Sequence, residues 1–193
     1  MWPSSRIGDM YEVRSSKRIY AKELTNAGIP FLKVADVLER IETGNCSPVT
    51  FISKTKFLEL KDAGLVPTVG DIILTSRGTI GKCYIIAEDD AFYFQDGMIS
   101  WLKPKPSCKL LPQFMVALFA DPDFSKAVDD ATNKTTVTYI SLDKLAGLRV
   151  ICPPTEKQRE YLSIVEQSDK SKFELKQAIE RIDNLIKSLI QQG

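Results

Sequence analysis

The spacing of apolar residues divides the chain into two regions. In the last forty or so residues, seam positions recur at alternating steps of four and three, and no Gly or Pro occurs between Thr155 and Gln192. This is a heptad pattern kept up over four repeats, which is typical of a coiled-coil helix. Ser168 and Lys172 are its two polar positions. The apolar seam positions are Tyr161, Val165, Leu175, Ile179, Ile182, Ile186 and Leu189.

The pattern predicts a helical arm over residues 154–193, preceded by a globular domain over residues 1–153. Pro153 and Pro154 precede the helix, and Thr155 with Gln158 has the spacing of a capping box. The alternative is a helix that packs on its own domain. Its length favours a projecting arm, because a helix this long exceeds one face of a small domain.

Short strand-like runs interrupted by Gly and Pro fill residues 1–153. One longer stretch, residues 112–130, has a helical apolar face formed by Phe114, Leu118 and Phe119, and "DPD" is expected to interrupt it. We therefore predict an α+β fold with a twisted, mostly β core and several helices. The strand-like runs are "IPFLKVADV", "VTFIS", "DIILTS", "KCYIIA", "AFYFQ", "MISWLKP" and "GLRVICPP".

The glycine-rich stretch "GDIILTSRGTIGKCYII" raises the question of a phosphate-binding loop. Its glycines do not have P-loop spacing, Lys82 is followed by Cys83, and the next residues favour a strand instead of a helix. A hairpin is therefore predicted, with Gly78 at positive φ. Two interpretations remain open: a purely structural hairpin, or a turn that presents Ser76, Arg77 and Thr79 to a ligand.

The amino-acid composition excludes several kinds of catalytic and metal site. The 193 residues include no histidine, which excludes Ser-His-Asp and Cys-His nucleophile systems and His-based metal sites. The four cysteines form no Cys-x-x-Cys pair, and "EDDAF" is expected to be a solvated turn rather than a catalytic carboxylate pair. We predict a non-catalytic, cytoplasmic protein without a metal site, a secretory signal or a membrane span. The net charge of +1 does not by itself indicate a polyanion partner.

Four segments in this order resemble the DNA-specificity subunits of type I restriction-modification systems. Each is weakly diagnostic alone, but together they cover nearly the whole chain and end in the helical arm. They are "GIPFLKVADV", "GDIILTSRGTIG", "AFYFQDGMISWLKP", which resembles a strand pair, and "YISLDKLAGLRVICPPTEKQ".

The resemblance implies a target recognition domain that reads one half of a bipartite sequence in double-stranded DNA. It also implies an arm that sets the spacing and docks methyltransferase (M) subunits, with a restriction (R) subunit in the full complex. No cofactor is expected in this chain; S-adenosylmethionine, ATP and Mg²⁺ belong to the partner subunits. Most members of the family carry two such domains and two arms, so this chain resembles a half-size form.

The resemblance makes three polar segments candidates for DNA contact. The turn offers Arg77 for a base or a phosphate, with Ser76 and Thr79 for phosphates. The two other segments are taken to be loops and could equally be ordinary solvated loops. They contribute Arg14, Lys17 and Arg18, and Asn133, Lys134, Thr135 and Thr136.

A single exposed seam needs a partner, and a second copy can supply it. We therefore expect a homodimer with antiparallel arms, which places one recognition domain at each end. Two alternatives stay open: a stand-alone dimeric DNA-binding regulator, and an inactive decoy specificity subunit that dimerises without directing methylation.

Overall fold

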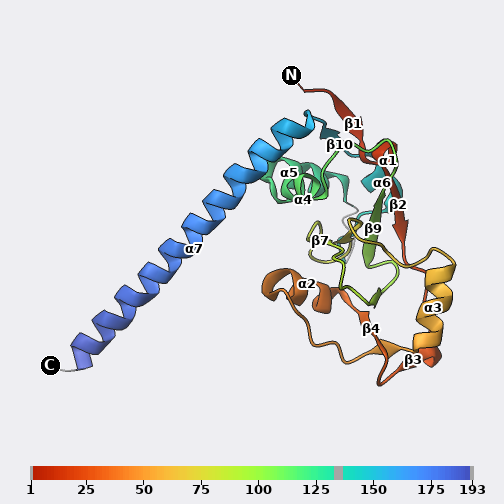
Figure 1. The fold of residues 1–193 in the computed structure, drawn as a ribbon, viewed down its shortest axis with the longest axis horizontal. Coiled ribbons are helices and arrows are strands. Elements are labelled where there is room, and N and C mark those ends of the chain that lie inside the picture. Colours follow the sequence, from red (N-terminus) through yellow and green to blue (C-terminus); the bar gives the residue numbers. More distant parts are fainter. Residues whose placement is uncertain (1, 133–136, 192–193) are drawn as a thin grey trace. The chain divides into compact units, whose positions relative to one another are not determined.

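The computed structural model describes residues 2–132 and 137–191 (Figure 1). The chain separates into two compact units, Met1–Pro153 and Pro154–Gly193. The division coincides with the change in hydrophobic pattern along the sequence. The first unit is a mixed α+β domain and the second is a single helix, so the predicted fold class is confirmed.

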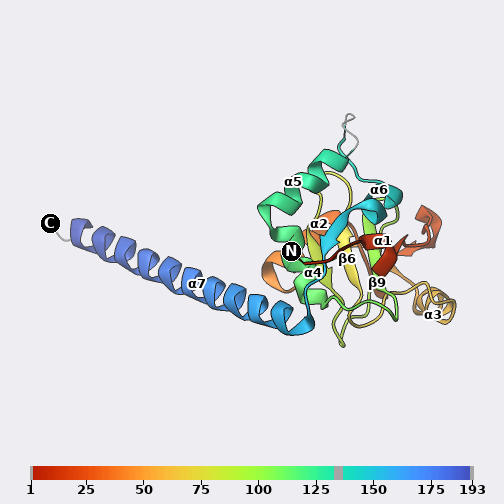
Figure 2. The same cartoon turned by 90° about the horizontal axis from the view of Figure 1, so that it is seen from above.

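The core of the first unit is an antiparallel sheet in the order β2-β9-β6-β7. Its two inner strands, β6 and β9, are labelled in Figure 2. The two inner strands, β6 and β9, are buried on both faces, which explains their nearly continuous apolar sequences. Ile73 lies opposite Trp101 in the register, and both side chains are fully buried. The strands are β2 (Tyr11–Ser15), β6 (Ile72–Thr75), β7 (Cys83–Ile85) and β9 (Ile99–Pro104).

A second sheet has the order β3-β5-β4-β8, and its β4–β8 pair is parallel. Gly28 precedes β4 at φ +134°, and a Cβ there would lie 2.4 Å from the Ile52 carbonyl oxygen, so this approach requires glycine. The strands are β3 (Leu24–Thr25), β4 (Ile29–Leu32), β5 (Phe51–Ile52) and β8 (Tyr93–Phe94).

Two strand predictions are wrong in part. The run "IPFLKVADV" is a strand only to Leu32, because helix α2 (Val34–Thr43) begins two residues later. Asp36 accepts a hydrogen bond from the Lys33 backbone N–H and so stabilises that helix start. The strands β8 and β9, which were expected to pair, do not pair with each other. β8 pairs with β4, whereas β9 lies between β2 and β6.

The predicted break at "DPD" is confirmed, because Asp121 ends α4 (Pro112–Ala120) and caps α5 (Pro122–Ala131). On α4 the buried residues are Phe114, Met115 and Phe119, so Met115 replaces Leu118 on the expected face. Sequence reasoning did not predict α3, which is capped by Ser53. The remaining elements are β1 (Ser4–Arg6) paired with β10 (Arg149–Ile151), α1 (Ile7–Met10), η1 (Ala21–Glu23), α3 (Lys54–Asp62) and α6 (Leu142–Gly147).

The segment "EDDAF" is not the fully solvated turn that the sequence suggested. The Asp90 side chain is only 2 % exposed and forms an ion pair with Arg40. It also accepts hydrogen bonds from the Tyr84 hydroxyl (3.3 Å) and the Ala87 N–H (2.7 Å). Arg40 lies over the rings of Tyr84 and Phe92. Asp90 therefore links α2 to the turn after β7.

The second unit is α7 (Thr155–Gln191), a helix of 37 residues. The Gln158 N–H donates to the Pro154 carbonyl, so Pro154 occupies the cap position and the predicted Thr155 cap is wrong. Val165 is half-buried, whereas Tyr161 and the apolar seam residues from Leu175 to Ile186 are exposed. The side chain of Leu189 lies outside the described part of the chain. Along the described seam, α7 thus presents an apolar stripe.

Candidate functional site

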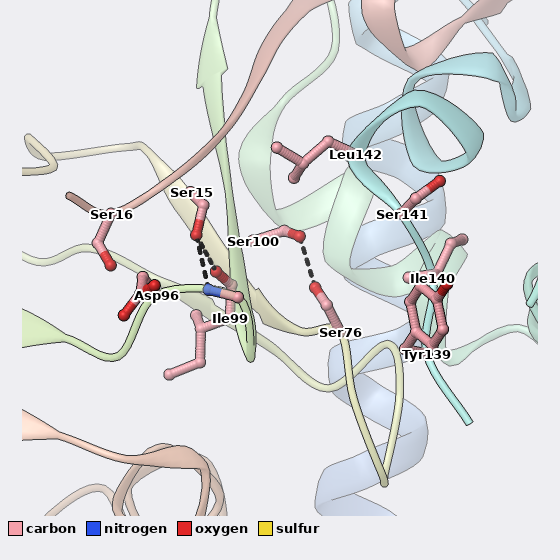
Figure 3. Close-up of a pocket in the computed structure, with 11 residues that line it drawn as sticks. Ser15, Ser16, Ser76, Asp96, Ile99, Ser100, Tyr139, Ile140, Ser141 and Leu142 are labelled. Carbon is pink, nitrogen blue, oxygen red and sulfur yellow. Dashed lines mark hydrogen bonds between the residues drawn. The ribbon is translucent and has the colours of Figure 1, made fainter. Parts of the chain in front are cut away.

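A cleft of about 360 Å³ lies in the first unit (Figure 3). Four segments that are far apart in the sequence line it. They are the end of β2 with the residue that follows, Ser76 after β6, the turn and first residues of β9 from Asp96 to Ser100, and residues 139–142, which lead into α6. The cleft therefore joins two of the three segments that the sequence singled out, together with the edge of the third.

Backbone pairing holds these segments together. The Ser76 N–H donates to the Met98 carbonyl at 2.9 Å, and the Ser76 carbonyl accepts from the Ile140 N–H at 3.0 Å. The Gly78 N–H donates to the Thr138 carbonyl at 3.0 Å, and Arg77 and Tyr139 form an isolated antiparallel bridge. The turn after β6 thus becomes a strand-like partner of residues 138–140, a long-range contact that no local pattern predicts.

The serine hydroxyls of the cleft serve the scaffold. Ser76 donates to the Ser100 hydroxyl at 2.5 Å, and Ser16 donates to the Phe94 carbonyl at 2.8 Å. Ser15 accepts from the Gly97 N–H at 3.1 Å, as Figure 3 shows. Because these hydroxyls already bond within the protein, they position the walls of the cleft. Ser76 was expected to contact phosphate, but it is buried at the bottom of the turn.

Charged groups with more freedom lie beside the cleft. Arg18 donates from Nε to Asp96 Oδ2 at 2.9 Å, and the two side chains are 68 % and 21 % exposed. The hydrogen bond and the negative charge of Asp96 raise the pKa of Arg18. Lys17 is exposed, and its backbone N–H donates to the Tyr93 hydroxyl at 2.8 Å. This chain segment is thus fixed by its backbone while its cationic side chains face solvent.

The predicted contact residues have different surroundings. Arg77 and Thr79 are exposed in the turn, as a contact role requires. Arg14 is not in a loop: it lies on β2, 4.6 Å over the Trp101 ring, and also pairs with Glu12 at 3.4 Å. A guanidinium held in this way supports the sheet. The fourfold cluster Asn133, Lys134, Thr135 and Thr136 lies outside the described residues.

The glycine-rich stretch is a hairpin, as predicted. Gly78 has φ +76° and Gly81 has φ +82°, which favours glycine at both positions. The turn is longer than expected and spans residues 76–82 between β6 and β7. Thr75 closes it, because its carbonyl accepts from the Gly81 N–H at 2.9 Å and its hydroxyl accepts from the Lys82 N–H at 3.1 Å.

Sequence reasoning missed Asp96 as a residue of the site. The available signal was the Asp-Gly dipeptide at residues 96–97 between two strand-like runs, which indicates an exposed turn. Gly97 has a positive φ, as such a turn requires. The partner of Asp96, Arg18, lies 78 residues earlier, so their contact follows only from the tertiary structure.

Within residues 2–132 and 137–191, no three His, Cys, Asp or Glu side chains lie close enough together to hold a metal ion. Over the same ranges, no helix combines the length and the apolar character that crossing a membrane requires.

The fold and the cleft define a class of protein in which a globular α+β domain with a surface cleft is followed by a long helix with an exposed apolar stripe. Residues 1–183 match the model of the type I restriction modification DNA specificity domain, and the chain belongs to that family. The resemblance inferred from the four sequence segments is thereby confirmed.

Individual relatives agree with this assignment. The chain is 27 % identical over 162 residues to the putative type I restriction enzyme specificity subunit S.HindORF215P of Haemophilus influenzae. The matched residues cover 83 % of this chain and 38 % of that protein. Among solved structures, the HsdS subunit from Thermoanaerobacter tengcongensis superposes with a TM-score of 0.61 at 19 % identity, over 92 % of this chain and 39 % of that one.

Another similar structure comes from work on complex assembly and conformational transition of the type I R-M system. It has a TM-score of 0.66 at 18 % identity and covers 97 % of this chain and 43 % of that chain. At these identities the superpositions establish the fold. The 193 residues span less than half the length of each of these relatives.

Proposed function

We propose that this chain is a non-catalytic DNA-recognition subunit of a type I restriction-modification complex. It would read one half of a bipartite target in double-stranded DNA and direct the M and R subunits to it, in the cytoplasm. The observation that carries the proposal is the cleft: exposed Lys17, Arg18 and Arg77 come from two loops near it, in a chain that belongs to the DNA specificity family.

The charged side chains suit two different kinds of contact with a DNA duplex. Lys17 is a flexible point charge and suits a phosphate, a contact that positions the protein without reading sequence. Arg77 is a planar donor in a turn anchored on both sides by backbone hydrogen bonds, which suits a base edge such as guanine O6 and N7. Thr79, in the same turn, suits a phosphate oxygen.

Chemistry is assigned to the partner subunits in this proposal. Methyl transfer from S-adenosylmethionine would occur on M subunits, and ATP with Mg²⁺ would act on the R subunit. This chain would contribute position only, through its cleft and its arm.

The arm supports a second part of the proposal, an antiparallel homodimer. The seam runs for 28 residue steps from Tyr161 to Leu189, which is ~42 Å of helix at ~1.5 Å per residue. That length corresponds to roughly 12 base pairs at ~3.4 Å each. Two copies related by a two-fold axis would therefore read identical, inverted half-sites about one helical turn apart, with an unread spacer between them.

The test is to express the chain together with its methyltransferase subunit and to map methylated positions in the host genome. We expect a palindromic, interrupted target that disappears when the chain is omitted. Co-purification of the M subunit separates this proposal from a stand-alone regulator, which would bind DNA without it. A complex that assembles but leaves the genome unmethylated would identify a decoy. A continuous target would refute the two-domain geometry.

A further inference from the structure

Asp96 is an unexpected residue on a surface that is proposed to face a polyanion. Its carboxylate lies at the cleft, is partly exposed, and is acceptor-only when ionised. Close to phosphates it would be repelled, so it favours binding only where the DNA presents hydrogen-bond donors. In the major groove those donors are the amino groups of cytosine N4 and adenine N6.

The ion-pair partner of Asp96 indicates which of these two bases fits the site. The ion pair uses Arg18 Nε and Asp96 Oδ2. Within the described parts of the chain, Asp96 Oδ1 and the two Arg18 Nη groups have no hydrogen-bond partner. The pair therefore presents guanidinium donors beside a carboxylate acceptor. A G·C base pair presents the complement in the major groove: the acceptors guanine O6 and N7 beside the cytosine N4 donor.

We propose that the Arg18–Asp96 pair reads one G·C base pair of the half-site, with Arg18 donating to guanine and Asp96 accepting from cytosine N4. This inference rests on the proposed function, because it requires that the cleft face DNA. It adds a specificity-determining residue, Asp96, which opposes general affinity for DNA while favouring one base pair.

The scaffold holds the backbone segments that carry Arg18 and Asp96 close together. On the Arg18 side, the Lys17 N–H donates to the Tyr93 hydroxyl and the Ser16 hydroxyl donates to the Phe94 carbonyl, both on β8. On the Asp96 side, the Gly97 N–H is bonded to Ser15. The segment of Arg18 and the turn of Asp96 are both tied to β2 and β8, so they cannot move apart freely. Their backbones are therefore preorganised for a planar base pair.

If the Arg18–Asp96 pair were purely structural, the loss of Asp96 would affect DNA affinity differently. If Asp96 served only to orient Arg18, its loss would free a cation, and affinity for every DNA would change in the same direction. If Asp96 reads cytosine, its loss should have opposite effects on the target and on random DNA. Random DNA should bind equally well or better, because a repelling charge is gone, while the target loses a base contact.

The experiment uses the full chain and a pool of duplex oligonucleotides with a randomised centre, followed by selection, sequencing and affinity measurement at two salt concentrations. Asp96→Asn keeps the shape but replaces one acceptor oxygen by a donor. We expect the preference for G·C at one position of each half-site to fall about tenfold or more. Affinity for unselected DNA should stay the same or rise.

Glu59→Gln on α3 is the charge-matched control, because it removes one negative charge from a weak surface pair with Lys56 and should leave the selected sequence unchanged. Equal losses on selected and random DNA in Asp96→Asn would overturn the inference, as would an unchanged preference at every position. The proposed function would survive either result. It would fall only if the wild-type chain selected no sequence at all.

Discussion

Ile179→Asp should separate the proposed homodimer without unfolding the first unit. Ile179 lies in the middle of the apolar stripe of α7, and the residue is 59 % exposed in a single chain. A dimer through this stripe would cover that remaining surface in both copies. An aspartate at this position would move a carboxylate out of water and against the apolar residues of the seam, which is costly.

The size of the effect follows from that exposure. Burying a whole Ile side chain contributes about 1.5–3 kcal/mol, so covering 59 % of it contributes about 1–2 kcal/mol per copy. Two-fold symmetry doubles the loss to about 2–4 kcal/mol. At about 1.4 kcal/mol per tenfold, the dimer should weaken at least about thirtyfold before the cost of the buried charge is added.

Sedimentation equilibrium at several protein concentrations measures the dissociation constant of the dimer directly. Gln177→Asp is the matched control, since two residues earlier on a helix the same charge projects from the opposite side. The control should dimerise like the wild type, and both variants should keep the thermal unfolding transition of the first unit. The reasoning is refuted if Ile179→Asp dimerises as tightly as Gln177→Asp, or if the wild type is monomeric at micromolar concentration without a partner.

Three further predictions concern the first unit. Arg77→Ala should reduce affinity for the selected target by about 1–3 kcal/mol and relax one base position, with unchanged circular dichroism; unchanged affinity at moderate salt would exclude the turn from the interface. Lys17→Ala should weaken target and random DNA equally and lower the salt slope by about one, and a sequence-dependent loss would assign it to base reading. Asp90→Ala should destabilise the unit by about 3 kcal/mol in urea unfolding, because Arg40 loses the partner of a largely buried pair, and a loss below about 1 kcal/mol would show that solvent already compensates the charge.

Local patterns accounted for much of the fold. The heptad spacing identified α7, the "DPD" break separated α4 from α5, and the glycine-rich stretch gave the hairpin β6–β7. These succeeded because periodicity and backbone-restricted residues act over a few neighbours. The strand "IPFLKVADV" failed at Lys33, where Asp36 caps a helix start and overrides the strand propensity of the following valines.

The candidate site was less accessible to sequence reasoning. Arg77 and Lys17 could be named from turn chemistry and charge, and they are exposed as expected. Arg14 has the same charge but lies over Trp101, because the alternation of β2 places it against β9. Ser76 is polar and close to Arg77, yet its hydroxyl bonds to Ser100, 24 residues away.

The sequence alone determined the division into an α+β domain and a helical arm, the seam of that arm, and the family. The first two follow from local periodicity, and the family follows from short motifs in chain order, so none of them requires knowledge of long-range contacts. Only the tertiary structure decided which polar side chains share a surface. The bridge between Arg77 and Tyr139 and the pairing of Arg18 with Asp96 join segments more than 60 residues apart. Such contacts depend on strand order and register, and these are set by the burial of whole strands in the common core and not by the residues that meet.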